Sequence, residues 1–187
     1  MIKKLLCFFF FSSAIAPFHA QSDAVQDWID VHNSGLVNFD FEQENEDSIS
    51  ISAQYLYGSV ARAIGGMYSV IEPLSKELEV VVLATASAQD KKVLGNERNQ
   101  LIQGLTEDDF EEFITMKNAE MDFTMYAIER GDYLTDFVFM MFTPEEKLRV
   151  INFQGRVHPD ELYNLFSNRE NLEDLISLGS LSIIEID

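Results

Sequence analysis

The sequence predicts an α+β fold, in which an antiparallel β-meander is extended by one or two N-terminal strands and helices pack on one face. Three apolar segments separated by short turns, at residues 119–129, 133–142 and 147–155, indicate the meander. Two earlier segments, 48–52 and 79–86, alternate or are continuously apolar, as strands do. The stretches between them carry apolar residues at helical spacing, which is the pattern expected of helices that cover a sheet.

The N-terminus, residues 1–20, predicts a secretory signal peptide. Lys3 and Lys4 precede an apolar block that is too short to span a bilayer, and Ala20 offers a small residue for cleavage. We expect cleavage after Ala20, so that the mature chain starts at Gln21 and retains no transmembrane span. The protein is therefore expected to be exported to the periplasm or cell envelope, or secreted.

Cysteine usage and charge limit the chemistry of the mature chain. Cys7, the single cysteine, is removed with the signal, which excludes thiol catalysis, disulfides and cysteine-bound metals. The signal also removes two of 13 basic residues and none of 32 acidic ones, leaving a charge of 11 − 32, or −21. Such acidity makes nucleic acid and anionic membranes improbable partners. It serves solubility or, in a more specific interpretation, recognition of a cation or a basic partner.

Residues 21–47 predict a short helix and an acidic connection. Apolar residues repeat at helical spacing over 23–33, and the segment 37–41 alternates as a half-buried strand would. The segment 40–47 is strongly acidic, so we expect it to be an exposed connection.

Residues 48–168 are expected to form a single domain, followed by an extension at 169–187. A helix should begin near Leu56, and another should cover Val93 to Leu105, where Gly104 would loosen its end.

A further helix is predicted to begin at Thr106. Thr106 and Asp109 resemble a capping box, and Phe110, Phe113 and Ile114 would form the inward face of this helix.

The last predicted helix opens at His158, with Leu162, Leu165 and Phe166 facing inward.

Several segments together resemble a known family. They are Asp-Phe-Glu-Glu-Phe-Ile from Asp109, Phe123-Thr-Met-Tyr-Ala-Ile, the Gly131 turn, Leu134-Thr-Asp-Phe-Val-Phe-Met-Met, and Ile151-Asn-Phe-Gln-Gly155 before an acidic helix start. With Ser-Ile-Ser-Ile-Ser and its following helix, this pattern resembles domain-of-unknown-function family 4252, small exported envelope proteins of bacteroidetes-type bacteria. The resemblance implies an exported location and this fold. It implies no active site, because the family carries no established activity.

Nucleophilic and metal chemistry find little support in the mature sequence. His32 and His158 are its histidines, both expected in ordinary surface roles, and no Gly-x-Ser-x-Gly elbow would hold a serine. Acids alternate from Asp40 to Glu46, but the glycine and the final glutamate of a helix-loop-helix calcium loop are missing. We therefore expect no metal site and no cofactor.

Clustered carboxylates leave an enzymatic alternative. The acids at Asp108, Asp109, Glu111 and Glu112 are expected on the exposed side of a helix, so that they would be solvated rather than catalytic. Two acids converging in a concave pocket, one of them substantially buried, would instead indicate a carboxylate-dependent hydrolase. The Arg-Gly-Asp tripeptide at 130–132 is expected in a hairpin turn, where these residue types are common.

Aromatic residues supply the leading hypothesis. They exceed what one helical face requires, so some could line a groove between helices and sheet. The candidates for ligand binding are Tyr55, Tyr57, Phe137 and Phe139. We therefore expect an exported, non-enzymatic protein that binds an envelope protein or an apolar, lipid-like ligand. The alternatives are a carboxylate-dependent hydrolase and a calcium-stabilised surface or adhesin component.

Overall fold

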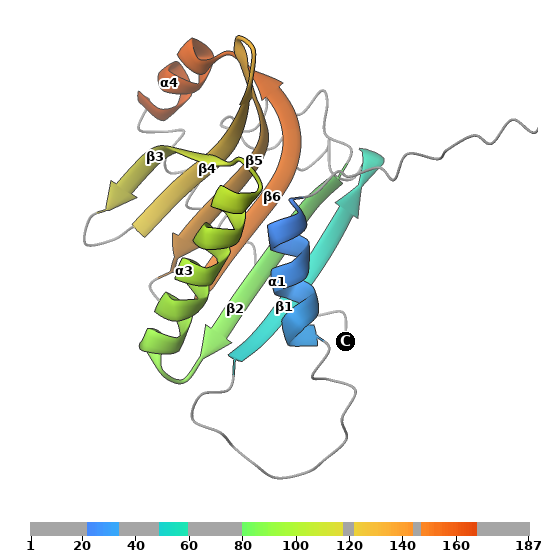
Figure 1. Ribbon diagram of the computed structural model, residues 1–187, viewed down its shortest axis with the longest axis vertical. Coiled ribbons are helices and arrows are strands. Elements are labelled where there is room, and N and C mark those ends of the chain that lie inside the picture. The colour runs from blue at the N-terminus through green and yellow to red at the C-terminus, as the bar shows by residue number, and fades with distance from the viewer. Residues whose placement is uncertain (1–21, 34–48, 60–79, 118–121, 144–146, 168–187) are drawn as a thin grey trace, which may run out of the picture.

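The computed structural model describes residues 22–33, 49–59, 80–117, 122–143 and 147–167, and Figure 1 shows how they are arranged. Their helices and strands are α1 (Asp23–Asn33), β1 (Ile49–Tyr57), β2 (Val80–Ala88), α3 (Lys91–Glu107), β3 (Glu111–Lys117), β4 (Asp122–Arg130), β5 (Tyr133–Phe142), β6 (Leu148–Val157) and α4 (Pro159–Ser167).

Several predicted features lie outside the described residues. They are the signal peptide, the strand at 37–41, the acidic segment 40–47, most of the helix near Leu56, and the extension 169–187. The start of that helix differs, because β1 continues through Leu56 and Tyr57.

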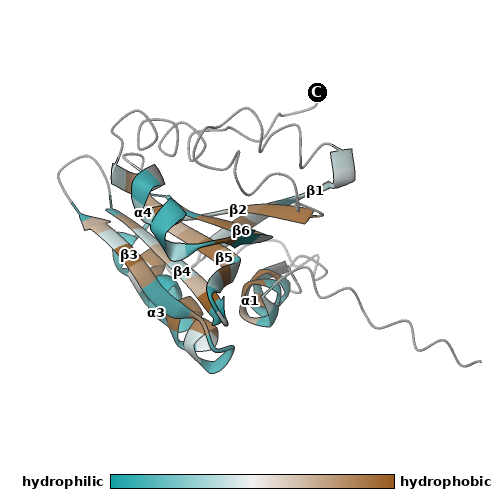
Figure 2. Ribbon diagram, turned by 90° about the horizontal axis from the view of Figure 1, so that it is seen from above, coloured by the Kyte–Doolittle hydropathy of each residue, from teal (hydrophilic) through white to brown (hydrophobic). Residues whose placement is uncertain are grey.

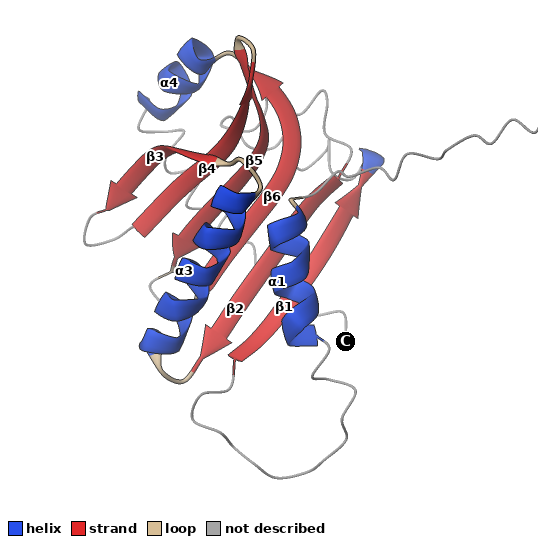
Figure 3. Ribbon diagram, viewed as in Figure 1, coloured by secondary structure: helices blue, strands red, loops and turns tan. Residues whose placement is uncertain are grey.

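The six strands form one antiparallel sheet in the order β1-β2-β6-β5-β4-β3 (Figure 3). The strands from β3 to β6 follow one another as a meander, and β2 and β1 extend it beyond β6. The α+β class and the meander with its two N-terminal strands are thus confirmed. β5 is central and apolar on both faces, as its continuous apolar sequence predicted.

The helices lie on both faces of the sheet rather than on one (Figure 2). Alternate residues of β5 point to opposite faces, so Val138 and Met140 join the core beneath α1 and α3. Phe137, Phe139 and Met141 join the core that contains Leu162 of α4. The prediction of a single helical face was therefore wrong in this respect: apolar spacing shows that a helix is covered, but does not show which face of the sheet it covers.

The core on the α4 side is built largely from phenylalanines. Phe137 stacks on Phe153 with ring centroids 5.3 Å apart, and Phe139 meets Phe153 edge-on at 5.1 Å. Phe123 lies 5.6 Å from Phe139 and 6.0 Å from Phe166 of α4. Each such contact adds to simple area burial by roughly 0.5–1.5 kcal/mol. Much of the aromatic content is therefore core packing.

The segment after Leu105 corrects the prediction of a second helix. Helix α3 runs on to Glu107, and Asp109 adopts φ of 65°, the left-handed conformation that ends helices. The N–H of Phe110 donates to Leu105 O at 2.9 Å and that of Asp109 to Thr106 O at 3.3 Å, which completes a Schellman motif. Residues Glu111–Lys117 then form β3. The Thr106 pattern lies at the end of a helix and not at a start.

Candidate functional site

A pocket of about 230 Å³ lies where the first turn of α1 approaches the end of α3 and the β4–β5 hairpin. Figure 1 shows the start of α1 and the end of α3 at the same end of the helical layer. The pocket is lined by Ser22, Asp23, Asp108, Asp109, Phe110, Ile128, Arg130, Asp136 and Gln154.

The close approach of the two helices depends on Gly104. A β-carbon at this position would lie 3.0 Å from the Cβ of Ala24, closer than the two chains could tolerate without movement. Gly104 therefore does not loosen the end of α3, as the sequence suggested. It allows the first turn of α1 to pack there and so brings Ser22 and Asp23 beside Asp108.

Ser22 is the N-cap of α1 and joins it to two other elements. Its hydroxyl accepts a hydrogen bond from the N–H of Val25 at 3.3 Å, as an N-cap side chain does. The same hydroxyl donates to Asp108 Oδ2 at 3.2 Å, and the N–H of Ala24 donates to that oxygen at 2.8 Å. The negative charge of Asp108 at this helix start is favourable for the helix dipole. Asp108 is thus mainly a fixed wall of the pocket.

The backbone of Ser22 is tied to the sheet through a buried asparagine. Its N–H donates to Asn152 Oδ1 at 3.2 Å, and Asn152 Nδ2 donates to the carbonyl of Phe137 at 3.1 Å. Asn152 is 1% exposed, and both ends of its amide are hydrogen-bonded. This pairing satisfies a buried polar group and fixes where α1 starts.

Asp136 is a second fixed carboxylate. It receives hydrogen bonds from Gln154 Nε2 and Thr135 Oγ1, each at 2.8 Å, and Arg130 Nη2 lies 3.6 Å from its Oδ2. Its φ is 50°, and the register of β5 shifts at this point against both neighbouring strands. A β-bulge therefore turns the Asp136 side chain out of the regular strand pattern and into the pocket lining.

Asp23 and Asp109 differ from these fixed carboxylates. Both residues are exposed, and neither side chain makes a hydrogen bond or ion pair with the rest of the described structure. Phe110, which is buried, and Ile128, which is half-buried, supply the apolar part of the lining. With four aspartates and one arginine, the lining carries a formal charge of −3. Such a pocket suits a positively charged group attached to an apolar stem.

A metal ion is a poorer fit to the same carboxylates. Although four aspartates line the pocket, the residues that the structure describes contain no group of three or more His, Cys, Asp or Glu able to hold a metal ion. Two of the four aspartates already receive hydrogen bonds from Ser22, Ala24, Thr135 and Gln154. The calcium alternative concerned segment 40–47, which lies outside the described residues.

The four predicted ligand-binding residues do not share a groove. Tyr55 packs with the α1 side of the sheet and its hydroxyl donates to Gln26 Oε1 at 3.1 Å. Tyr57, two residues along β1, is 61% exposed. Phe137 and Phe139 lie in the core of the opposite face and are 0% and 1% exposed. Ligand binding at any one of them stays a prediction, but one groove lined by all four is not formed.

Sequence reasoning missed the pocket for identifiable reasons. Asp108 and Asp109 were assigned to the solvated side of a helix, whereas they follow α3 and line the pocket, and Asp108 accepts a hydrogen bond from the first turn of α1. Asp136 carried a usable signal, because it is the one charged residue of the largely apolar β5. Glu111 and Glu112, by contrast, are exposed as expected, although on a strand.

His32 and His158 lie away from this pocket. His158 is near the start of α4, where its Nδ1 accepts a hydrogen bond from the N–H of Asp160 at 3.3 Å. His32 is less exposed than predicted: its Nδ1 donates to the carbonyl of Trp28 at 2.8 Å, and its Nε2 lies 3.3 Å from Glu97 Oε2. Trp28 Nε1 donates to the same carboxylate oxygen at 3.1 Å, so this group fastens α1 to α3.

Comparison with known proteins identifies the family and no nearer relative. Neither the curated proteins nor the solved structures contain a match to the chain. None of the helices in the described segments has the length and apolar character needed to cross a membrane. The family model of a domain of unknown function, DUF4252, matches residues 66–165, which is more than half of the 187-residue chain. The match contains most of the pocket lining, while α1 and β1 precede it. The chain therefore belongs to the DUF4252 family.

Proposed function

We propose that this protein is a non-enzymatic binding module of the cell envelope, and that its acidic pocket receives a lysine or arginine side chain of a partner protein. The envelope location follows from the predicted signal peptide. The formal charge of −3 in the lining supports a cationic group, and Phe110 and Ile128 support an apolar stem behind that group.

The backbone at the pocket is the observation that carries this proposal. Among the described residues, two that are not glycine have positive φ, Asp109 at 65° and Asp136 at 50°. Both are aspartates, and both line the pocket. Residues in this region of φ/ψ space cost free energy and tend to cluster at functional sites. Asp109 occupies the helix-end position where glycine is the usual residue, so a carboxylate stands there at some expense in stability.

The size of the pocket also favours a side chain over a larger ligand. Its volume of about 230 Å³ is below the roughly 300–1,000 Å³ of typical small-molecule sites. A lipid-like ligand would need a longer apolar surface. Within the described residues, the large hydrophobic side chains that are exposed, Val31, Tyr57 and Tyr163, lie on three different elements.

The test measures by NMR titration how strongly the mature protein binds N-acetyl-lysine methylamide and its uncharged norleucine analogue. Asp109→Gly is the informative variant, because it removes an unpaired carboxylate and supplies the residue preferred at this backbone position. We expect Asp109→Gly to stabilise the fold by about 0.5–1 kcal/mol and to weaken lysine binding about fivefold.

Glu111→Gln is the matched control, because it makes the same change in charge at an exposed position on β3. It should leave lysine binding unchanged. Equal binding of the lysine and norleucine probes, or a loss in Glu111→Gln as large as in Asp109→Gly, would contradict the proposal.

A carboxylate-dependent hydrolase is the second candidate, because the structure does bring four carboxylates to one concave pocket. Asp136, with its side chain 17% exposed, is the candidate for the largely buried acid that this chemistry needs. Turnover of aryl glycosides or ester substrates by the mature protein, lost in Asp136→Asn but kept in Glu111→Gln, would favour this function over simple binding.

A further inference from the structure

Strand β1 leaves one side of its backbone without a strand partner in the described part of the chain. It stands at the end of the sheet order and pairs with β2 through nine consecutive residues, with no shift of register. In an antiparallel strand, every second residue directs its N–H and C=O away from the neighbour. These outward groups of β1 form a regular row that another extended chain can hydrogen-bond.

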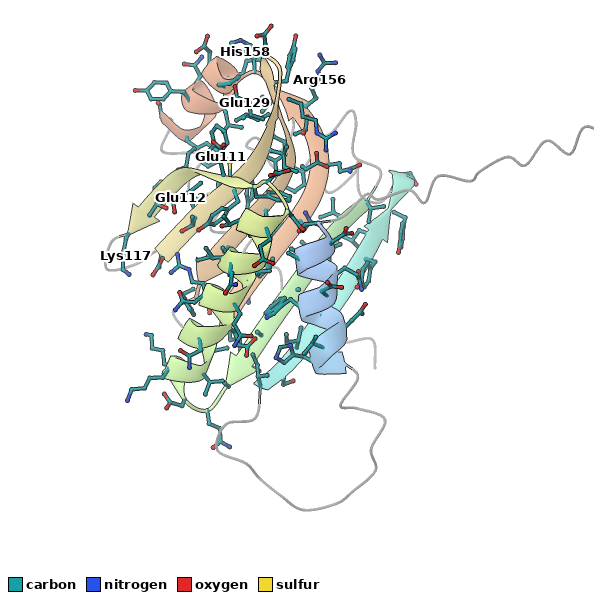
Figure 4. All side chains as sticks on the ribbon, viewed as in Figure 1. Glu111, Glu112, Lys117, Glu129, Arg156 and His158 are labelled. Carbon is teal, nitrogen blue, oxygen red and sulfur yellow. The ribbon has the colours of Figure 1, made fainter. Side chains whose placement is uncertain are left out.

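The sequence of β1 lacks the features that normally protect an edge. Its nine residues, Ile-Ser-Ile-Ser-Ala-Gln-Tyr-Leu-Tyr, include no charged residue and no proline. Natural edge strands are usually short, charged, interrupted by proline, or bent by a bulge. The opposite edge, β3, has two of these features: it carries Glu111, Glu112 and Lys117, and its register shifts between Glu112 and Ile114. Figure 4 shows the three charged side chains along β3.

The surface beside β1 indicates the chemistry of what could bind there. Helix α1 packs over β1, where the hydroxyl of Tyr55 donates to Gln26 Oε1 and Gln26 Nε2 donates to Asp30 Oδ1 at 2.9 Å. Asp23, Asp27 and Asp30 are exposed and spaced four and three residues apart, so they share one side of α1. A strand added beside β1 would therefore present alternate side chains near an acidic helix.

We propose that the β1 edge binds an extended segment of a partner protein as a seventh strand, with lysine or arginine at the alternate positions that face α1. Such a segment would cover nine residues, a length of about 30 Å. A second copy of the chain is disfavoured as the occupant, because it would bring together two acidic α1 helices and two mature chains of charge −21 each (11 − 32). The inference extends the proposed partner binding to a second surface and does not depend on the pocket.

The test uses synthetic peptides and NMR of the ¹⁵N-labelled mature protein at fixed ionic strength. The first peptide alternates lysine and valine over nine residues, matching the length of β1, and the second replaces its lysines with glutamates. Two further lysine–valine peptides carry N-methyl groups on every second amide, one in each phase. We expect chemical-shift changes in β1, and binding about tenfold tighter for lysine–valine than for glutamate–valine. N-methylation should abolish binding in the phase that faces β1 and leave it in the other.

Two double variants that change the net charge equally distinguish the effect of the acidic side chains of α1 from the effect of net charge. Asp27→Asn with Asp30→Asn should reduce the preference for the lysine peptide to about twofold. Glu111→Gln with Glu112→Gln, on the other edge, should leave the preference unchanged. Asp109→Gly, the pocket variant, should also leave it unchanged, which distinguishes failure of this inference from failure of the proposed function.

Three results would overturn the inference. One is the absence of saturable shifts in β1. Another is binding that N-methylation in neither phase disturbs, because a strand addition requires those amides. The third is self-association of the free protein through β1 in sedimentation equilibrium, which would assign the edge to a second copy.

Discussion

Strand β1 forms one edge of the sheet with nine uncharged residues in unbroken register, whereas β3 forms the other with seven residues, three of them charged, and a bulge. Side-chain bonds also hold β3 to its neighbour β4: Lys117 Nζ lies 3.2 Å from Asp122 Oδ2, and Tyr126 Oη donates to Glu112 Oε2 at 3.4 Å. Within the described part of the chain, the sheet thus has one edge with protecting features and one edge without them. A fold that avoids edge pairing on one side and permits it on the other indicates where a partner strand is tolerated.

The largest expected difference between the two edges is in how much the buried side chains at each edge contribute to the free energy of unfolding. Phe123 of β4, next to β3, is fully buried and contacts Phe139 and Phe166, so Phe123→Ala should lower the free energy of unfolding by about 3–5 kcal/mol. Ile51 of β1 is 8% exposed, and Ile51→Ala should cost about 2 kcal/mol, at the lower end for such changes. Urea unfolding of both variants measures the two costs. An equal loss of unfolding free energy in the two variants would show that core packing stabilises β1 as much as it stabilises the β3 side, and would contradict this expectation.

A smaller loss of stability is expected when the polar contacts of Arg98, on the β3 side of the sheet, are removed. Arg98 of α3 lies 3.1 Å from Asp122 Oδ1, donates to Thr124 Oγ1 at 2.8 Å, and lies 5.5 Å above the ring of Phe142. Arg98→Met keeps the aliphatic stem but loses these contacts, so it should destabilise the protein by about 2 kcal/mol.

Arg156→Met is the control for Arg98→Met, because the exposed Arg156 lies 3.9 Å over the ring of Tyr133 and makes a comparable cation–π contact. This change should cost about 0.5–1 kcal/mol. Thermal melts of the two variants test this difference. An Arg98→Met protein as stable as Arg156→Met would contradict the expectation that the polar contacts of Arg98 stabilise the fold.

The smallest effect is a loss of stability at alkaline pH on the β3 side. Burial raises the pKa of Tyr126 above its ordinary value of 10.0, and the nearby charge of Glu112 raises it further. Because the folded state holds this proton more tightly than the unfolded state, the stabilisation is complete below pH 10 and is lost as pH rises toward the folded pKa. Unfolding measured from about pH 9 to 11 should show a steeper decline in the natural protein than in Tyr126→Phe.

The control is Tyr163→Phe, which makes the same chemical change at a tyrosine that is 75% exposed. Its decline with pH should match that of the natural protein. A Tyr126→Phe protein that declines as steeply would mean that Tyr126 titrates alike in both states.

Period-two patterns and turn residues were sufficient to predict most of the sheet from the sequence. They did not predict β3, and the residues of β3 show why. Phe110, Phe113 and Ile114 have helical spacing, but Phe110 precedes β3, and the bulge at Phe113 brings Phe113 and Ile114 to one face of the strand. Phe113 and Ile114 both pack on the α4 side as a result, while Phe110 joins the opposite core. A bulge depends on pairing with β4, which local sequence does not contain.

The candidate site was less predictable because it is assembled from distant residues. Ser22 and Asp108 are 86 positions apart, and Gly104 leaves room for the first turn of α1 to approach the end of α3, where they meet. The four aromatic candidates do not line one groove, for a related reason. Tyr55 and Phe137 are both in strands, but the alternation of each strand places them on opposite faces once the register is set. Asp136 alone gave a local signal, as a charge within an apolar strand.

Residue-resolved amide hydrogen exchange, with and without the lysine–valine peptide, tests most directly whether β1 is an open edge and β3 a closed one. In the free mature protein, every second amide of β1 should exchange rapidly, because those groups point away from β2. We expect the peptide to slow exchange at these β1 amides and to leave exchange in β3 unchanged. Protection that appears at β3 instead, or β1 amides that already exchange as slowly as those of β2 without peptide, would contradict this expectation.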